Sequence, residues 1–218
     1  MKKAIILLLL LPLLVSAQET NILDSRGKKQ GIWQKSYENG VLRYKGQFKD
    51  NIPFGIFTYY YVTSELQAQK EFFHNGKAAA THYYYKSGEL KAAGLYVDGK
   101  QDSTWCFYSK DSVLILSEDY SKGLLDGTTK TFYDSGNIFE IKHWKDGIEE
   151  GVWRQFFLDG TLKMECTMEK GKRNGQQLYY HPNGKLYSEG RFKDDSKIGD
   201  WEYYNEKGVS DTLISYSE

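Results

Sequence analysis

The sequence lacks an excess of either charge. It contains 29 Lys and Arg residues against 29 Asp and Glu residues, and the two signs are interspersed along the whole chain. A protein that binds nucleic acid or an anionic membrane surface electrostatically carries a basic face or cluster. No such cluster occurs here, so we expect no nucleic-acid partner.

Cysteine is scarce, because Cys106 and Cys166 are the only two in 218 residues. They occupy different positions of the repeat described below and lie two repeats apart. In a linear array of strands this separates them by roughly 19 Å, whereas a disulfide needs Cα atoms within about 7 Å. We therefore expect both thiols to remain unbridged within the chain.

Recognisable catalytic and metal-binding motifs are also missing. Neither a G-x-S-x-G elbow nor a P-loop is present. The histidines fall at unrelated repeat positions and do not converge on a metal or an acid–base site: His74, His82, His143 and His181. Acids that recur at one repeat position are typical of turns, namely Asp50, Asp98, Asp146 and Asp194. We expect no catalytic residue, no metal and no cofactor, and hence a non-enzymatic protein.

The sequence has one long apolar run, and it lies at the beginning. Lys2 and Lys3 precede the run from Ala4 to Val15, and Ser16 and Ala17 follow it. This order is typical of a secretory signal peptide. The run is too short to span a bilayer comfortably, and no second run of about 18 apolar residues follows. We expect cleavage near Ala17 and an exported mature chain, periplasmic or secreted, without a transmembrane segment.

A 24-residue repeat organises the rest of the chain. Glycines recur at multiples of this interval, with Ala79 and Ser103 at the two missing steps: Gly31, Gly55, Gly127, Gly151, Gly175 and Gly199. Eight units therefore start at 31, 55, 79, 103, 127, 151, 175 and 199, and positions are counted from each start. Position 6 is aromatic in seven units, position 12 is Leu or Ile in seven, and position 18 is aromatic or Met in all. Such self-similarity predicts a repeat architecture.

Each unit reads as a β-hairpin. Positions 12, 14, 16 and 18 are mostly apolar or small and alternate with polar residues, which is the period of a strand. An aromatic-rich stretch at positions 2 to 7 forms the other strand. Pro182, at position 8, argues for a three-residue loop at positions 8 to 10 that ends on a left-handed glycine. Position 6 then faces position 12, so that Tyr60 meets Leu66, Phe132 meets Ile138 and Tyr180 meets Leu186.

Short turns within and between the hairpins predict an all-β fold: an elongated single antiparallel meander of about sixteen strands. The expected organisation is a signal peptide (1–17), an N-terminal half repeat that caps the first edge (18–30), and eight hairpin repeats (31–218). The last strand, which ends near Tyr216, would leave an open edge.

Several phrases resemble MORN repeats of the bacterial variant type. They are Gly31-Ile-Trp33, Tyr83-Tyr-Tyr-Lys-Ser-Gly-Glu-Leu90 and Tyr179-Tyr-His-Pro-Asn-Gly-Lys-Leu186. The resemblance covers nearly all of residues 20–218 and implies no catalytic residues. Proteins with such repeats are often catalogued as antitoxins of toxin–antitoxin pairs, the YwqK family, and other MORN arrays are elongated scaffolds. Units two and four depart from the pattern, because Ser64 and Ser112 replace the turn glycine.

Aromatic side chains exceed what a one-sided sheet requires. With position 6 facing position 12, positions 3, 5 and 7 point away from the face that holds positions 6, 12 and 18. If they are exposed, the rings form a contact surface; if the sheet curls or bulges, they are buried. The candidate binding surface consists of Trp33, Phe57, Tyr59, Tyr83, Trp105, Trp153, Trp201 and Tyr203.

Three functions are compatible with these observations. The first is a protein-interaction scaffold with a protein partner. The second is binding of a glycan or another envelope polymer through the aromatic stripe, and the third is antitoxin-like neutralisation of a partner protein.

Overall fold

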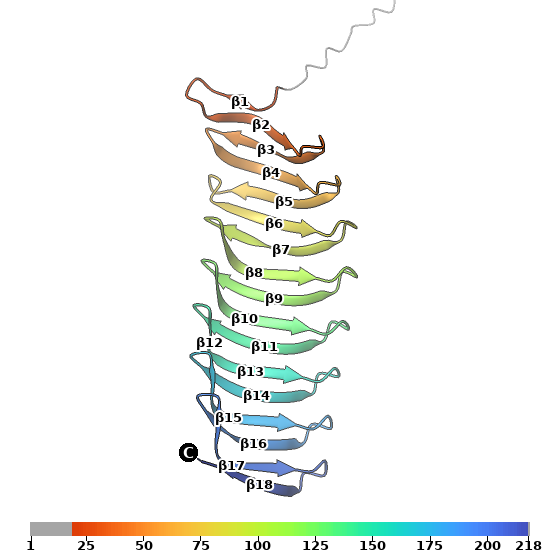
Figure 1. Ribbon diagram of the computed structural model, residues 1–218, viewed down its shortest axis with the longest axis vertical. Coiled ribbons are helices and arrows are strands. Elements are labelled where there is room, and N and C mark those ends of the chain that lie inside the picture. The colour runs from red at the N-terminus through yellow and green to blue at the C-terminus, as the bar shows by residue number, and fades with distance from the viewer. Residues whose placement is uncertain (1–18, 218) are drawn as a thin grey trace, which may run out of the picture.

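The computed structural model describes residues 19–217 as one antiparallel sheet of 18 strands. Consecutive strands pair with one another, except that β12 and β13 both pair with β11, so the topology is a meander in which the chain runs steadily from one end of the sheet to the other (Figure 1). The strands are β1 (Ile22–Leu23), β2 (Lys29–Ser36), β3 (Leu42–Lys49), β4 (Ile52–Tyr60), β5 (Leu66–Phe73), β6 (Ala78–Tyr84), β7 (Leu90–Val97), β8 (Lys100–Tyr108), β9 (Leu114–Ser121), β10 (Leu124–Phe132), β11 (Ile138–Lys145), β12 (Ile148–Glu149), β13 (Gly151–Phe156), β14 (Leu162–Glu169), β15 (Lys172–Tyr180), β16 (Leu186–Lys193), β17 (Ser196–Tyr204) and β18 (Ser210–Tyr216).

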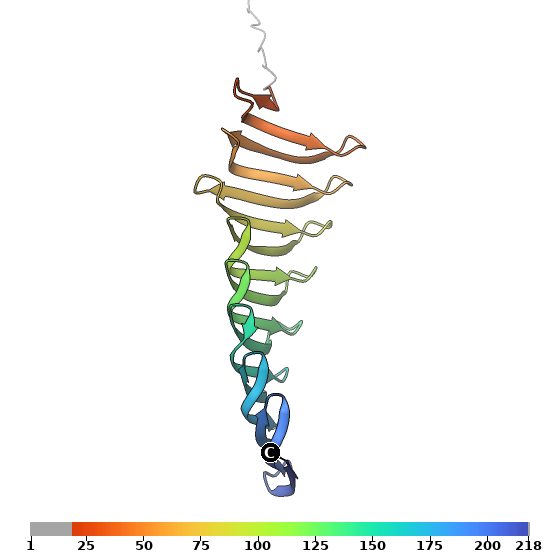
Figure 2. The same ribbon diagram turned by 60° about the vertical axis from the view of Figure 1, so that its left-hand side comes forward.

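The overall shape is a tall, narrow stack with β1 and β18 at opposite ends (Figure 1). Turned by 60°, the strands near the N-terminal end are seen broadside and those near the C-terminal end almost end-on (Figure 2). The sheet therefore twists progressively along its length, as strand sterics require. The expected fold class is confirmed, and none of the described residues is helical. The expected signal peptide, residues 1–17, lies outside the described residues.

Within each unit the hairpin has the predicted register. Tyr60 pairs with Leu66, Phe132 with Ile138 and Tyr180 with Leu186. In unit one the amide of Tyr37 donates to the carbonyl of Val41, and the amide of Gly40 donates to that of Tyr37. These bonds enclose the three-residue loop at positions 8 to 10.

The turn glycine of this loop adopts a left-handed conformation, as Gly40 with φ +83° illustrates. Ser64 and Ser112 take the same conformation, with φ of +81° and +61°, and the same hydrogen bonds close their loops. Units two and four therefore keep the common turn despite their serines. The left-handed region is unfavourable for a side chain with a β-carbon, so both serines are strained.

A β-bulge beside this loop overturns the predicted distribution of side chains between the two faces. Tyr60 pairs with Leu66, but the preceding residue, Tyr59, pairs with Ala68 and leaves Gln67 as an extra residue. The other hairpins shift in the same way, as at Phe156. Position 12 therefore lies on the opposite face from positions 14, 16 and 18. The expectation that positions 3 and 5 point away from position 18 is wrong: positions 3, 5, 14, 16 and 18 share one face, named the front face here, and the other is the back face.

Between units the chain uses a tight turn followed by a second, larger bulge. Lys49 pairs with Ile52 across the two-residue turn Asp50-Asn51, in which both residues have positive φ. The ladder then passes from Gln47 opposite Phe54 to Lys45 opposite Thr58, so residues 55–57 lie opposite the single residue 46. Gly55, with φ +64°, begins this bulge. The glycine that marks the repeat period is thus the residue that allows the backbone to bulge.

The junction between units two and three is built differently. The β5–β6 ladder runs from Phe73 opposite Ala78 to Ala68 opposite Tyr83 without a register shift. A four-residue loop, residues 74–77, replaces the two-residue turn. The two residues omitted from the bulge are therefore accommodated in the loop, and the 24-residue period is preserved. Ala79 lacks a positive φ, which explains why this unit does not need the glycine.

The two ends of the sheet differ. Ile22 and Leu23 of β1 pair with Gln30 and Lys29 of β2, and the side chain of Asn21 accepts a hydrogen bond from the amide of Gln34. The segment before unit one thus covers the first edge. At the other end β18 pairs with β17 alone among the described residues. No helix within residues 19–217 is long and apolar enough to cross a membrane.

Candidate functional site

The structure buries three of the eight aromatic residues of the candidate binding surface. Phe57, Trp105 and Trp201 are only 3%, 1% and 0% exposed. Trp33, Tyr59, Tyr83, Trp153 and Tyr203 are half-buried. Exposure is therefore wrong for the first three, which the bulges bury, and the other five rings remain partly accessible.

Three position-3 rings, Phe57, Trp105 and Trp201, are buried because each packs on the backbone of the preceding unit. A β-carbon added to Gly46 would lie 2.2 Å from Phe57, and one added to Gly94 would lie 2.2 Å from Trp105. Gly190 has the same relation to Trp201. The aromatic residue comes from the large bulge, and the glycine is the single residue opposite it. A glycine at position 16 and an aromatic at position 3 of the next unit thus form one packing motif.

Neighbouring rings extend this motif along the front face. The ring centroids of Phe48 and Phe57 lie 5.2 Å apart, and those of Phe57 and Phe72 lie 5.0 Å apart, both edge to face. Tyr96 and Trp105 are 4.9 Å apart and Phe192 and Trp201 are 5.2 Å apart in the same geometry. These pairs contribute roughly 0.5–1.5 kcal/mol each beyond burial. A row of aromatic rings therefore forms much of the core of this single-layer sheet.

The row is interrupted at three junctions where position 3 is not aromatic. Thr81, Thr129 and Gln177 stand there and are all buried. The residues at position 16 before them are Lys70, Glu118 and Cys166 in place of glycine. A small or polar residue at position 3 thus accompanies a larger residue at position 16. Sequence reasoning missed this pairing, although its signal is visible when the two positions are read together.

A hollow of about 330 Å³ lies on the front face near the first interruption, over units three and four. Its lining includes the rings of Tyr83, Tyr96, Trp105 and Phe107, and the small side chain of Ala92. The hydroxyl groups of Tyr83 and Tyr96 are 3.4 Å apart. A second hollow of about 380 Å³ adjoins it on the other side of Tyr96 and is lined by Lys70, Lys77 and Ala79, among others. The two are called the unit-three hollows.

Lys70 is half-buried beside these hollows. Its Nζ lies 4.7 Å from the ring centroid of Tyr96 and 5.8 Å from that of Tyr83. Neither Lys70 nor Lys77 takes part in any ion pair among residues 19–217. Burial lowers the pKa of the Lys70 ammonium, because it penalises the charged form. The arrangement is a cation held between two aromatic faces without a carboxylate partner.

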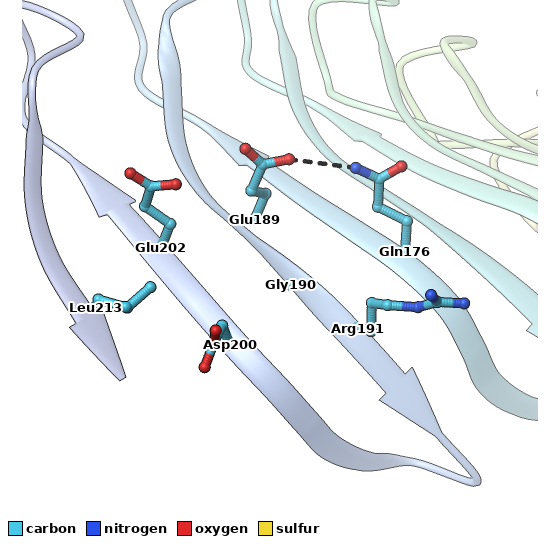
Figure 3. Close-up of a pocket in the computed structure, with 7 residues that line it drawn as sticks. All are labelled: Gln176, Glu189, Gly190, Arg191, Asp200, Glu202 and Leu213. Atoms are coloured by element: carbon cyan, nitrogen blue, oxygen red, sulfur yellow. Dashed lines mark hydrogen bonds between the residues drawn. The ribbon is translucent and has the colours of Figure 1, made fainter. Parts of the chain in front are cut away.

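A polar hollow of about 640 Å³ lies over the last strands (Figure 3). Glu189 and Glu202 lie on adjacent strands, with Asp200 farther along β17 and Arg191 farther along β16. Glu189 accepts hydrogen bonds from Gln176 Nε2 at 3.2 Å and from the Tyr204 hydroxyl at 2.9 Å. The Ser215 hydroxyl donates to Asp200. These carboxylates are therefore partnered within the chain.

Glu202, in the same hollow, has a pKa lowered by hydrogen bonds from Ser210 and Tyr204. A proton donor for acid–base chemistry normally needs a raised carboxyl pKa near the working pH. The direction of the shift is the opposite here. Together with the internal partners of Glu189 and Asp200, it argues for a structural role of this polar surface.

Two of the four histidines bond to backbone carbonyls. The ring of His143 bonds through Nδ1 to the carbonyl of Val152 at 2.6 Å, and His181 Nε2 bonds to the carbonyl of Tyr204 at 2.9 Å. Within residues 19–217 no group of three or more His, Cys, Asp or Glu side chains is placed to hold a metal ion. Both cysteines are free, as expected, with Cys166 buried and Cys106 half-buried.

An exposed apolar patch lies on the back face where unit one joins unit two. Ile52, Phe54 and Ile56 alternate along β4, and Phe73 ends the neighbouring strand β5. Their exposed fractions are 42%, 42%, 55% and 38%. A hollow of about 360 Å³ borders Ile52, Phe54 and Phe73 beside the four-residue loop. Unlike Phe57, Trp105 and Trp201 on the front face, these four side chains are exposed to solvent.

Comparison with known families identifies the repeat. A family model described as MORN repeat variant matches residues 29–50, 125–146, 149–170 and 173–194. Each matched segment begins two residues before a unit start and covers both strands of one hairpin. Units one, five, six and seven are thus matched as MORN repeat variants; the match concerns the repeat and does not extend to the YwqK antitoxin family. No curated protein matches the chain.

Proposed function

We propose that this chain is an exported, non-enzymatic scaffold that binds a partner protein through the back-face patch of Ile52, Phe54, Ile56 and Phe73. MORN-type hairpins form a repeat-based binding module, and a stack of them offers long surfaces on a rigid frame. The single observation that carries the proposal is the exposure of these four large apolar side chains on adjacent strands. Clustered exposed apolar residues of this kind mark contact sites.

The composition of the patch favours a protein partner. Two phenylalanines and two isoleucines supply apolar area, and Lys49 and Asp50 at the same hollow supply a charged rim. This combination of an apolar centre with a polar rim is the usual anatomy of a protein–protein interface. Full burial of a large apolar side chain stabilises by roughly 1.5–3 kcal/mol relative to full exposure. Four half-exposed side chains therefore suffice for the energetic centre of a modest interface.

Export rests on the N-terminal sequence. Lys2 and Lys3, the apolar run from Ala4 and the small residues before Gln18 have the order of a cleavable signal. Expression of the full chain in a bacterium, followed by fractionation and N-terminal sequencing, tests this. A mature chain that begins at Gln18 in the periplasm or medium is expected. An uncleaved chain in the cytoplasm contradicts export but leaves the patch untouched.

The binding role is tested by measuring how much of each partner protein the immobilised mature chain retains. Wild type is compared with Phe54→Ser plus Phe73→Ser, and with Leu158→Ser, which removes an exposed apolar residue from a distant loop. We expect one protein to be retained equally by wild type and the Leu158 variant, and to be lost with the patch variant. Equal retention by all three baits rejects the patch. Unchanged circular dichroism and melting temperature ensure that the patch variant is folded.

A further inference from the structure

The unit-three hollows have chemistry that the protein-binding patch does not share. They lie on the front face, whereas the patch lies on the back face, and the hollow beside the patch shares Phe72 and Gly76 with one of them. Rings, hydroxyl groups and ammonium groups converge on the hollows, and the patch is mainly apolar. The front-face site therefore calls for a different ligand.

The hollows adjoin the junction between units two and three, which departs from the rest of the row. In the neighbouring junction Trp105 covers Gly94. In the unit-three junction Lys70 replaces the glycine and lines one hollow together with the small Ala78 and Ala79. Ala92, at position 14, lines the other hollow where unit six has Met164 and unit four has Leu116. Small side chains form the floor and large rings the walls.

The aromatic hollow fits a sugar ring. At about 330 Å³ it is at the small end of ligand pockets. A pyranose presents C–H groups on its faces and hydroxyl groups around its rim. Phe107 offers a partly exposed ring face, the buried indole of Trp105 lies behind it, and the Tyr83 and Tyr96 hydroxyls and the Gln101 amide line the same space. A purely apolar ligand would leave these polar groups without partners, which is costly.

The adjoining hollow adds positive charge without a counter-ion. Lys70 and Lys77 line it, and neither forms an ion pair among the described residues. Lys70 is fixed between Tyr83 and Tyr96, the rings that also line the sugar-sized hollow. An anionic group on the sugar next to the bound ring would meet both ammonium groups. Hydrogen bonds from ammonium to carboxylate are stronger than neutral ones.

We propose that the unit-three hollows bind an acidic oligosaccharide, with one ring against Tyr83, Tyr96 and Phe107 and a neighbouring carboxylate at Lys70 and Lys77. The site is non-covalent and uses no metal. Trp105 lines the same hollow from beneath its surface, so binding changes the surroundings of its indole and tryptophan fluorescence reports occupancy. The interaction weakens with added salt, because both ammonium groups face solvent-accessible space.

The probe is the tetramer of galacturonic acid, titrated into the mature chain by calorimetry and by tryptophan fluorescence. Saturable binding is expected with the wild type. Ala92→Leu fills the floor of the hollow with a side chain that unit four already carries at position 14, as Leu116. Binding is expected to disappear in this variant. Lys70→Gln is expected to weaken binding about tenfold, the loss of one good interaction.

Lys163→Gln is the matched control, because it removes a lysine that lies over the ring of Phe157 far from unit three. Its affinity is expected to equal that of the wild type. Two further ligands separate the chemical classes: a neutral glucose tetramer and a tetraglutamate peptide. Both are expected to bind at least about tenfold more weakly than the uronate.

Three results overturn the proposal. They are no saturable binding of the uronate to wild type, equal binding to Ala92→Leu and wild type, and a peptide affinity that matches the uronate affinity. The last result means that the ammonium groups recognise negative charge and not the sugar. If Ala92→Leu does not fold, the affinities of Lys70→Gln and Lys163→Gln for the uronate are compared instead, and equal affinities overturn the proposal. Failure here leaves the back-face patch untested, since none of these substitutions touches it.

Discussion

The indole of Trp201 lies directly against the α-carbon of Gly190, 11 residues earlier on the neighbouring strand. A β-carbon on Gly190 would lie 2.2 Å from Cδ2 of the indole. Gly190 has an ordinary φ, so its requirement for glycine comes from the ring and not from the backbone conformation. The same contact recurs at Gly46 with Phe57 and at Gly94 with Trp105.

Gly190→Ala is expected to destabilise the fold by about 1–3 kcal/mol, the usual cost of overpacking a core. The control is the same substitution in a Trp201→Thr background, where the indole is gone. There the alanine is expected to be neutral or to stabilise by up to about 1 kcal/mol, because glycine weakens a strand. Urea denaturation of the four proteins gives the values. Equal costs in both backgrounds contradict the contact.

The strained turn serines give a prediction of the opposite sign. Ser64 and Ser112 have φ of +81° and +61°, where other units carry glycine. Ser64→Gly and Ser112→Gly are each expected to stabilise by about 1 kcal/mol through relief of this strain. Ser117→Gly, inside β9, is the control and is expected to destabilise by roughly 0.5–1 kcal/mol. Melting temperatures that fall for all three variants would show that the serine turns are unstrained.

Tyrosines at the hairpin tips connect one unit to the next. The hydroxyl of Tyr85 donates to the carbonyl of Tyr108 at 2.8 Å, and Tyr37, Tyr61 and Tyr133 make the same bond 23 residues ahead. Tyr85→Phe is expected to cost about 0.5–1.5 kcal/mol, the net value of a hydrogen bond.

Position 7 of unit six supplies the reciprocal test. Phe157 lacks a hydroxyl, and Phe157→Tyr is expected to gain the bond to the carbonyl of Tyr180 and to stabilise by a similar amount. Chemical denaturation measures both variants. A loss of stability in both would mean that the tip contact depends on packing and not on the hydroxyl.

The N-terminal cap should respond to acid. The side chain of Asp24 accepts hydrogen bonds from the amides of Lys28 and Arg26, and these bonds lower its pKa to about 2. A carboxylate with a folded-state pKa below the unfolded value of about 3.9 stabilises the fold above that value. This contribution is lost as the pH falls through about 2.

Hydrogen exchange tests the cap directly. Protection of the Lys28 amide relative to that of Gly40, which is bonded to a backbone carbonyl, is expected to be constant above pH 4 and to fall between about pH 4 and pH 2. In Asp24→Ala the ratio is expected to be low at every pH. A parallel response of the two amides in the wild type contradicts the role of Asp24.

Much of the fold could be predicted from the sequence, because the repeat displays the hairpin eight times. Pro182 and the position-10 glycines fixed the loop, and the pairing of Tyr60 with Leu66 followed from it. The bulges could not be read in the same way. A bulge adds residues to one strand without altering the 24-residue period, so the alternation at positions 12 and 14 looked continuous although these positions lie on opposite faces.

The same bulges determine which residues of the candidate site are exposed. An uninterrupted register would expose Trp105 and Trp201. The bulges that begin at Ser103 and at Gly199 instead turn these two rings onto the preceding unit. The sequence did not indicate the exposed patch at Ile52 and Phe54. A period of two shows which residues share a face of the sheet, but it does not show whether other residues cover that face. The unit-three hollows combine the small side chains of Ala92 and Ala79 with Lys70 at a position that carries glycine in other units, a combination that single positions do not reveal.

The central claim is that position 16 of one unit and position 3 of the next form a complementary pair that closes the front face. Its most direct test transplants the pair into the bulged junction between units four and five, as Glu118→Gly plus Thr129→Trp. Each single change is expected to destabilise, the first by leaving a gap and the second by overpacking. The double variant is expected to be more stable than their sum by about 1–3 kcal/mol in urea denaturation, and a coupling energy of zero would contradict the claim.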